Sequence, residues 1–159
     1  MTKSEKKLAN YINSTCEKSV YACYTDGSCN NLSQRGEGGA AYIVLRDGEE
    51  VHRASKGMIG TTNNRAEMLA VISAVNWCPP GADIRIYTDS RYCIGAFLRK
   101  GCLPGNLKNI DLIHLYRKVA SGKRVYFEWV KGHDGDTYNE IVDGMANGEY
   151  KKMCEMINA

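Results

Sequence analysis

Two strand-like runs in this chain end in the same three residues, Tyr-Thr-Asp. The first run covers residues 20–26 and the second covers 83–89, and a helix-like segment over 65–77 lies between them. A strand–helix–strand connection favours parallel, neighbouring strands. Parallel neighbours would place Asp26 and Asp89 at the same carboxyl edge of one sheet, which is where open α/β sheets bind their ligands.

The remaining segments complete an α/β order with a mixed sheet. Residues 40–46 and 50–59 are predicted to be strands joined by a tight turn at Asp47-Gly48, and the Gly-, Asn- and Ser-rich stretch 27–39 to be a turn. The other predicted elements are helices at 91–98, 109–120 and 139–157 and a strand at 125–130. Residues 1–18 are predicted to be an N-terminal arm with a short helix, and 19–159 to be one domain.

Composition narrows the functional classes. The chain has 159 residues, 43% of them hydrophobic and 25% charged, which is ordinary for a single domain with a buried core. No apolar run approaches the roughly 20 residues of a membrane span, and no signal-peptide core follows the first residues, so a cytoplasmic protein is predicted. The seven cysteines form no Cys-x-x-Cys pair, and we interpret them as free thiols without structural zinc.

Four carboxylates, at Asp26, Glu67, Asp89 and Asp143, carry the functional prediction. Magnesium prefers such hard oxygen ligands, and two ions about 3.5–4 Å apart can activate a water and stabilise the leaving oxygen of a phosphodiester. His133 lies between glycine and Asp-Gly, where an imidazole could shuttle a proton or assist product release. The sequence thus favours metal-dependent phosphodiester cleavage.

Each acid also has an interpretation without catalysis. Glu67 follows Asn64 by three residues and could complete a capping box. Asp26 could be a turn residue, Asp89 could cap the next helix, and Asp143 could be a solvated helix charge. A metal site is excluded only if all four of these interpretations are correct at once. Taken together, the four acids therefore favour a metal site.

Four blocks of the sequence resemble the type 1 ribonucleases H, in family order and with similar gaps. They are Tyr24-Thr25-Asp26-Gly27-Ser28-Cys29, Thr62-Asn63-Asn64-Arg65-Ala66-Glu67, Tyr87-Thr88-Asp89-Ser90, and Trp129-Val130-Lys131-Gly132-His133 with Asn139-Glu140 and Asp143 beyond. The resemblance covers about residues 20 to 155. It implies the ribonuclease H-like α/β fold, a five-stranded mixed sheet flanked by helices. It also implies a two-metal-ion endonuclease that hydrolyses the RNA strand of RNA–DNA hybrids and leaves 3′-hydroxyl and 5′-phosphate ends.

The resemblance implies roles for individual residues. Asp26, Glu67, Asp89 and Asp143 match acids that hold two Mg²⁺ ions, with Mn²⁺ as a substitute, and His133 matches the family's mobile catalytic histidine. Glu67 also matches an acid that contacts a ribose 2′-hydroxyl, the group that distinguishes RNA from DNA. Substrate contacts are predicted at Gly27, Ser28, Cys29, Thr62, Asn63, Asn64, Ser90 and Arg91. No obligate protein partner is implied, and a monomer is predicted.

The chain departs from the family pattern in the segment after the third acid. Many members carry a Lys- and Trp-rich protrusion there, whereas the interval from Asp89 to Asp111 contains no tryptophan. The protrusion is therefore predicted to be short or missing, which affects substrate affinity rather than chemistry. Asp134 and Asp136 add charge beside His133, where they could raise its pKa, attract metal, or simply be solvated.

Three rival functions stay open on the sequence. One is a DNA-cutting nuclease of the same fold, although such enzymes usually lack the Asn-Asn-Arg-x-x-Glu context. Another is a hybrid-binding module without catalysis. The last is a domain cut from a reverse transcriptase polyprotein, against which Met1 and the arm argue mildly.

Overall fold

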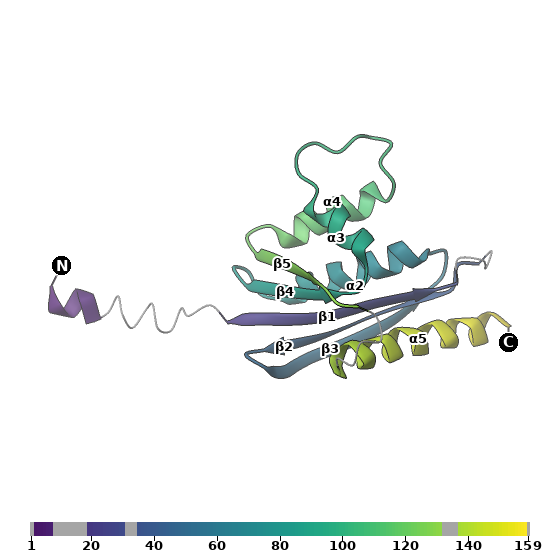
Figure 1. The fold of residues 1–159 in the computed structure, drawn as a ribbon, viewed down its shortest axis with the longest axis horizontal. Coiled ribbons are helices and arrows are strands. Elements are labelled where there is room, and N and C mark those ends of the chain that lie inside the picture. Colours follow the sequence, from purple (N-terminus) through teal and green to yellow (C-terminus); the bar gives the residue numbers. More distant parts are fainter. Residues whose placement is uncertain (1, 8–18, 31–34, 132–136, 159) are drawn as a thin grey trace.

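The computed structural model describes residues 2–7, 19–30, 35–131 and 137–158. Residues 3–7 form a short helix in the predicted arm, where Thr2 Oγ1 accepts a hydrogen bond from the Glu5 amide (3.1 Å) and Glu5 accepts one from the Thr2 amide (2.5 Å). The other elements, in chain order (Figure 1), are β1 (Val20–Cys29), β2 (Gly38–Arg46), β3 (Glu49–Met58), α2 (Asn63–Trp77), β4 (Asp83–Thr88), α3 (Arg91–Leu98), α4 (Ile110–Ala120), β5 (Arg124–Trp129) and α5 (Thr137–Asn158).

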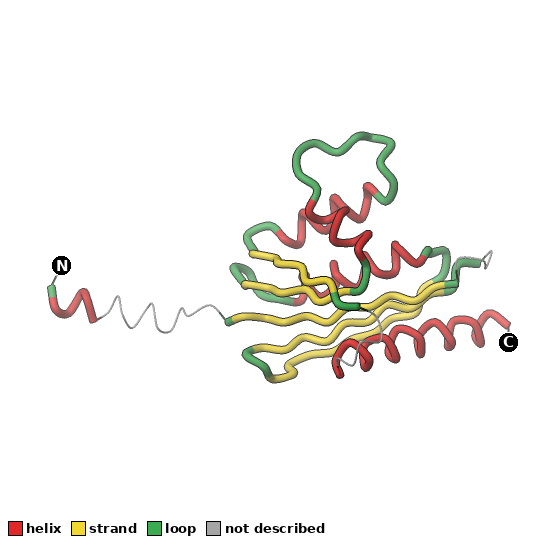
Figure 2. Tube along the Cα trace, in the orientation of Figure 1, coloured by secondary structure: helices red, strands yellow, loops and turns green. Residues whose placement is uncertain are grey.

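The five strands form one mixed sheet in the order β3-β2-β1-β4-β5, which Figure 2 shows in yellow. Strand β2 pairs antiparallel with β1 and β3, whereas β4 pairs parallel with β1 and β5. Both sequence predictions, the mixed α/β sheet and the parallel neighbours ending near Asp26 and Asp89, are confirmed. The helix α2 connects the antiparallel half of the sheet to its parallel half.

The helices form two layers, with α2, α3 and α4 on one face of the sheet and α5 on the other (Figure 1). Successive side chains of a strand point to opposite faces of the sheet, so each strand contributes apolar residues to a core on both faces. In β2, Val44 faces the larger core under α2, and its neighbour Ile43 faces the smaller core under α5, where Val142 and Ala146 cover it. Burying one such side chain stabilises the fold by roughly 1.5–3 kcal/mol.

The strand boundaries correct one prediction. Residues 27–39 are not simply a turn, because β1 continues to Cys29, β2 begins at Gly38, and Ser28 pairs with Gly39. The glycine at position 39 serves packing rather than turning: a Cβ there would lie 2.2 Å from the Ala146 carbonyl oxygen of α5. The hairpin at Asp47-Gly48 is confirmed, with Asp47 in the left-handed conformation (φ 49°) that a type I′ turn requires.

The cysteines within the described residues are free thiols, as predicted; Cys16 lies outside those residues. The Sγ atoms of Cys23 and Cys78 are 3.9 Å apart in the larger core. Burial raises the pKa of Cys93 to about 12, so this thiol acts as a small apolar side chain. Among the helices described, none is both long enough and apolar enough to cross a membrane.

Candidate active site

Three of the four predicted acids meet where β4 ends beside β1. Asp26, Glu67 and Asp89 each place a carboxylate oxygen so that all three oxygens lie within 4.8 Å of one another. The parallel pairing of β1 with β4 explains why Asp26 and Asp89 are close. Tyr24 pairs with Tyr87, and their rings stack with centroids 4.7 Å apart. Asp26 and Asp89 each follow one of these tyrosines by two residues, so they share its face of the sheet.

The fourth acid, Asp143, comes from the second turn of α5 and is half-buried. Its carboxyl group hydrogen-bonds with that of Asp26. It lies outside the group of three mutually close acids. The helix α5 therefore brings Asp143 to Asp26 from the face opposite α2.

Gly27 allows Glu67 to reach the other acids. The backbone of α2 crosses β1 at this residue: a Cβ on Gly27 would lie 2.3 Å from the Glu67 nitrogen and 2.5 Å from the Ala66 carbonyl carbon. Real Cβ atoms essentially never approach backbone so closely. Any side chain at position 27 would push the start of α2, and Glu67 with it, away from the sheet edge.

The helix caps contradict the interpretations of these acids as ordinary structural residues. The N-cap of α2 is Thr62, whose Oγ1 accepts from the amide three residues on (3.2 Å), so Glu67 in the second turn cannot complete a capping box. Ser90 rather than Asp89 caps α3. Asp26 lies inside β1 instead of in a turn, although its Oδ1 accepts from the next amide (3.0 Å).

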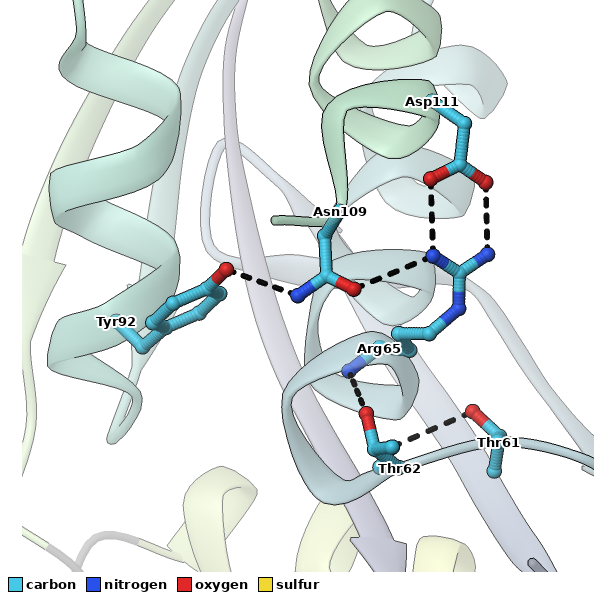
Figure 3. Close-up of polar contacts among 6 residues, drawn as sticks. All are labelled: Thr61, Thr62, Arg65, Tyr92, Asn109 and Asp111. Atoms are coloured by element: carbon cyan, nitrogen blue, oxygen red, sulfur yellow. Dashed lines mark hydrogen bonds and ion pairs between the residues drawn. The ribbon is translucent and has the colours of Figure 1, made fainter. Parts of the chain in front are cut away.

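A polar network around Arg65 fixes the start of α2 against two other helices (Figure 3). Arg65 donates to both carboxylate oxygens of Asp111 (2.9 and 2.8 Å) and to Asn109 Oδ1 (3.3 Å). Asn109 in turn donates from its amide to the Tyr92 hydroxyl of α3 (2.8 Å). Bidentate arginine–carboxylate pairing is geometrically specific, so the network orients the turn that carries Asn63 and Asn64.

The acid cluster holds its protons strongly. Burial, the hydrogen bond that protonated Asp26 donates to Asp143, and the charge of Asp89 raise the pKa of Asp26 to about 8. Burial and the charges of Asp26 and Asp89 raise the pKa of Glu67 well above its ordinary value. Burial and neighbouring like charges both disfavour the ionised form of these two acids. Perturbed acids in such a cluster are typical of functional sites.

The residues fit a divalent cation. Glu67 Oε2 is buried and has no hydrogen-bond partner within the residues that the structure describes, so one hard donor atom of a cluster residue is left unsatisfied. All three close ligands are carboxylates, the donors that magnesium and manganese prefer over the softer metals. Asp26, Glu67 and Asp89 could hold such an ion, whose charge would favour their ionised forms.

The other predicted residues have definite places. Ser28 donates to Asn147 Oδ1 of α5 (2.7 Å), and Cys29 Sγ donates to the Thr61 carbonyl (3.6 Å). Asn63 and Asn64 open α2, and Arg91 opens α3. His133, Asp134 and Asp136 lie outside the described residues.

Sequence reasoning assigned no role to Arg65 or Trp129. Both lie inside the motifs, but their partners are far away in the sequence: Asp111 for Arg65, and Asp89 and Arg91 for Trp129. Between α3 and α4, residues 99–109 form a loop without helix or strand. Arg117 holds that loop by donating to the carbonyls of Gly101 (2.7 Å) and Arg99 (3.0 Å).

We expect Gly27→Ala to lower the free energy of unfolding by about 1–3 kcal/mol, the usual range for overpacking, because the new Cβ collides with the α2 backbone. It should also weaken Mn²⁺ binding, because Glu67 is displaced. Urea unfolding and calorimetric titration measure the two effects. Gly148→Ala on α5 is the matched control: its Cβ meets nothing within 4 Å, and it should stabilise the protein by about 0.5–1 kcal/mol. Equal stability of the two variants would contradict the packing argument.

The pKa of Asp26 predicts a pH dependence for the metal-free protein. Because the folded-state pKa is about 8 and the ordinary value is 3.8, the folded protein keeps a proton that the unfolded chain releases between these limits. Stability in EDTA should therefore fall as pH rises from about 4 to 8, with a slope of up to about 1.4 kcal/mol per pH unit for one proton. Urea unfolding of wild type and Asp26→Asn across this range measures it. Asp26→Asn should have the flatter profile and exceed wild type at pH 8; parallel profiles would disprove the assignment.

Comparison with known proteins gives one consistent result. The ribonuclease H family model matches residues 18–151. The chain is 36% identical over 139 residues to a ribonuclease H of Campylobacter concisus, covering 84% of this chain and 94% of that protein. It is 38% identical over 140 residues to one of Pseudoalteromonas translucida, covering 82% and 88%.

Solved structures show the same fold. LC9-RNase H1, described as a type 1 enzyme with the type 2 active-site motif, superposes with a TM-score of 0.73 at 24% identity, covering 86% of this chain and 74% of that one. The N-terminal RNase H domain of a Mycobacterium tuberculosis protein, solved as a fusion with maltose-binding protein, gives 0.72 at 18% identity, covering 88% and 99%. Together with the acid cluster, the family match and the curated relatives show that the chain belongs to the ribonuclease H family of hydrolytic endonucleases.

Proposed function

We propose that this chain hydrolyses the RNA strand of RNA–DNA hybrids as a divalent-metal-dependent endonuclease. The observation that carries the proposal is the meeting of Asp26, Glu67 and Asp89 at one sheet edge in a member of the ribonuclease H family. The buried, unsatisfied oxygen of Glu67 supports metal binding there. Magnesium is the proposed ion, with manganese as a substitute.

We assign two ions to the site, with Asp26 and Asp89 as central ligands and Glu67 and Asp143 each completing one ion's shell. Bound ions in such a pair activate the attacking water and stabilise the leaving oxygen. The protein's own contribution is rigidity: Asp26 lies within β1, Asp89 directly follows its neighbour β4, and Glu67 is held by packed helix backbone. His133 is proposed to move a proton or assist product release.

The start of α2 is proposed to recognise the hybrid. Gly27, Asn63 and Asn64 would contact the minor groove, where A-form geometry exposes the ribose 2′-hydroxyl. Thr62 would contact a DNA phosphate; as the N-cap it stands beside the amides of a helix N-terminus, which favour anions. Phosphate contacts position the duplex without reading its sequence. Further substrate contacts are proposed at Ser28, Cys29, Ser90 and Arg91.

The surrounding organisation is proposed as follows. Residues 1–18 are an arm outside the ribonuclease H domain of 19–159, supported by the family match that begins at residue 18. The chain acts as a monomer without an obligate protein partner. A cytoplasmic location is supported by the free thiols, because disulfides are rare in reducing compartments.

Hybrid cleavage is the direct test. A hybrid labelled on either strand should lose its RNA strand in magnesium and remain intact in EDTA. Asp89→Asn should lower the rate by more than about 100-fold, beyond the usual cost of an outer-shell group, while the fold survives. Asp47→Asn removes the same charge from the β2–β3 hairpin and should retain full activity. Cleavage of duplex DNA instead of hybrid would favour a DNA nuclease, and binding without cleavage would favour a hybrid-binding module.

The chemical ends of the products test the direction of attack. Activated water attacking with the 3′-oxygen as leaving group gives 3′-hydroxyl and 5′-phosphate ends. We therefore expect the downstream RNA fragments to accept a 5′ label from polynucleotide kinase only after phosphatase treatment. Upstream fragments should be extended by a polymerase without any treatment. Fragments with 2′,3′-cyclic phosphate ends would contradict the mechanism, because attack by the neighbouring 2′-hydroxyl needs no activated water.

A further inference from the structure

Trp129, the last residue of β5, makes two separate contacts with the corner between β4 and α3. Its indole Nε1 donates to the Asp89 carbonyl oxygen (3.1 Å). Its ring lies under the Arg91 guanidinium, with Cζ 4.2 Å from the ring centroid. The side chain is 44% exposed, too much for a residue whose main task is to fill the core. One side chain thus contacts both the third acid of the cluster and the cationic residue two positions beyond it.

The neighbouring contacts make this corner a defined structure. Thr88 lies opposite Trp129 in the ladder, and its carbonyl accepts from the Val130 amide (2.9 Å). Thr88 Oγ1 accepts from the Ser90 amide (3.0 Å), and Ser90 Oγ caps α3. Trp129 adds a clamp on Asp89 itself, whose carboxylate must stay within reach of the other acids.

The stack on Trp129 also determines what Arg91 can do. A guanidinium two residues from Asp89 could fold onto the acid cluster and compete with a cation there. Over the indole ring it is attracted by the π system instead. Within the described residues the Arg91 guanidinium makes no hydrogen bond or ion pair, so its N–H groups are left for the oxygens of a phosphate diester.

We propose that Trp129 is a positioning residue of the active site, which clamps the main chain of Asp89 for metal binding and holds the Arg91 guanidinium over its ring for a backbone phosphate of the substrate. The part of the proposal that concerns Asp89 and metal binding rests only on the acid cluster. The part that concerns Arg91 and a phosphate rests on the proposed hybrid substrate. The two parts predict different measurements. Loss of the N–H should affect metal affinity, and loss of the ring should affect substrate affinity as well.

The test compares Trp129→Phe, which keeps a ring but loses the donor, with Trp129→Leu, which loses both. Calorimetric titration of the nuclease with Mn²⁺, without hybrid, should show affinity reduced about three- to tenfold in both variants, as expected for one hydrogen bond. With saturating magnesium, the KM for hybrid should rise about two- to fivefold in Trp129→Leu, the range of an exposed cation–π contact, and stay near wild type in Trp129→Phe. The kcat should change less than KM, because no reacting atom is touched.

Arg91→Gln completes a double-mutant cycle. Alone it should raise KM and leave Mn²⁺ affinity unchanged, and adding Trp129→Leu to it should raise KM no further. Trp77→Phe, which alters the chain's other tryptophan at the far end of α2, is the control and should leave both constants unchanged. Unfolding midpoints show whether each variant is folded. If Trp129→Leu does not fold, Trp129→Phe alone still tests the effect on Mn²⁺ affinity.

Two results would overturn the proposal: unchanged Mn²⁺ affinity in both folded Trp129 variants, or additive effects on KM in the cycle. The Mn²⁺ titration needs no cleavage, so it distinguishes this failure from failure of the proposed function. If the wild-type protein binds Mn²⁺ but does not cut the hybrid, the proposed substrate is wrong. The proposed effect of Trp129 on metal binding is then unaffected.

Discussion

The parallel pairing of β1 with β4 is the interaction on which the rest of the site depends. It fixes Tyr24 opposite Tyr87, and with them the direction in which Asp26 and Asp89 leave the sheet. Neither carboxylate could reach the other if one strand slipped by one residue, because the side chains of that strand would then turn to the opposite face. The stacked tyrosines and the buried isoleucines of β4 oppose such a slip, so ordinary packing energy holds two like charges together.

Holding acids together has an electrostatic cost that no lysine or arginine in the described part of the chain relieves by an ion pair with Asp26 or Glu67. The groups that act most strongly on Asp26 and Glu67 are other acids and burial. Two arginines are close in the sequence, and both are engaged elsewhere. Arg65 pairs with Asp111, and Arg91 lies on Trp129. An internal salt bridge would stabilise the metal-free fold but would occupy the carboxylate oxygens. Directing the arginines away leaves the acids short of positive charge, the condition under which a divalent cation binds well.

The sequence predicted which helices and strands exist better than it predicted where they end. It also predicted the acids of the site better than the residues that hold them in place. The hairpin and the parallel strands have local signals, namely Asp-Gly and a strand–helix–strand order. The stretch 27–39 was misjudged because glycine marks both turns and close packing, and only the α2 and α5 backbones distinguish the two. Thr61 to Asn64 offer several equivalent caps, and tertiary contacts select Thr62. The partners of Arg65 and Trp129 lie far away along the chain, so no local pattern could predict those contacts.

Asp26 differs from the other acids because it meets groups from both layers of the fold. Glu67 reaches it from α2 past Gly27, Asp143 reaches it from α5, and Asp89 stands beside it on the next strand. Glu67 responds to Asp26 and Asp89, whereas Asp143 acts on Asp26. The cluster is therefore two overlapping groups that share Asp26. In the proposed two-ion site, this asymmetry would make the two positions unequal, one among three close carboxylates and the other completed by Asp143. Because α2 and α5 pack on opposite faces, each could adjust the position of its own acid while leaving the β1–β4 ladder unchanged.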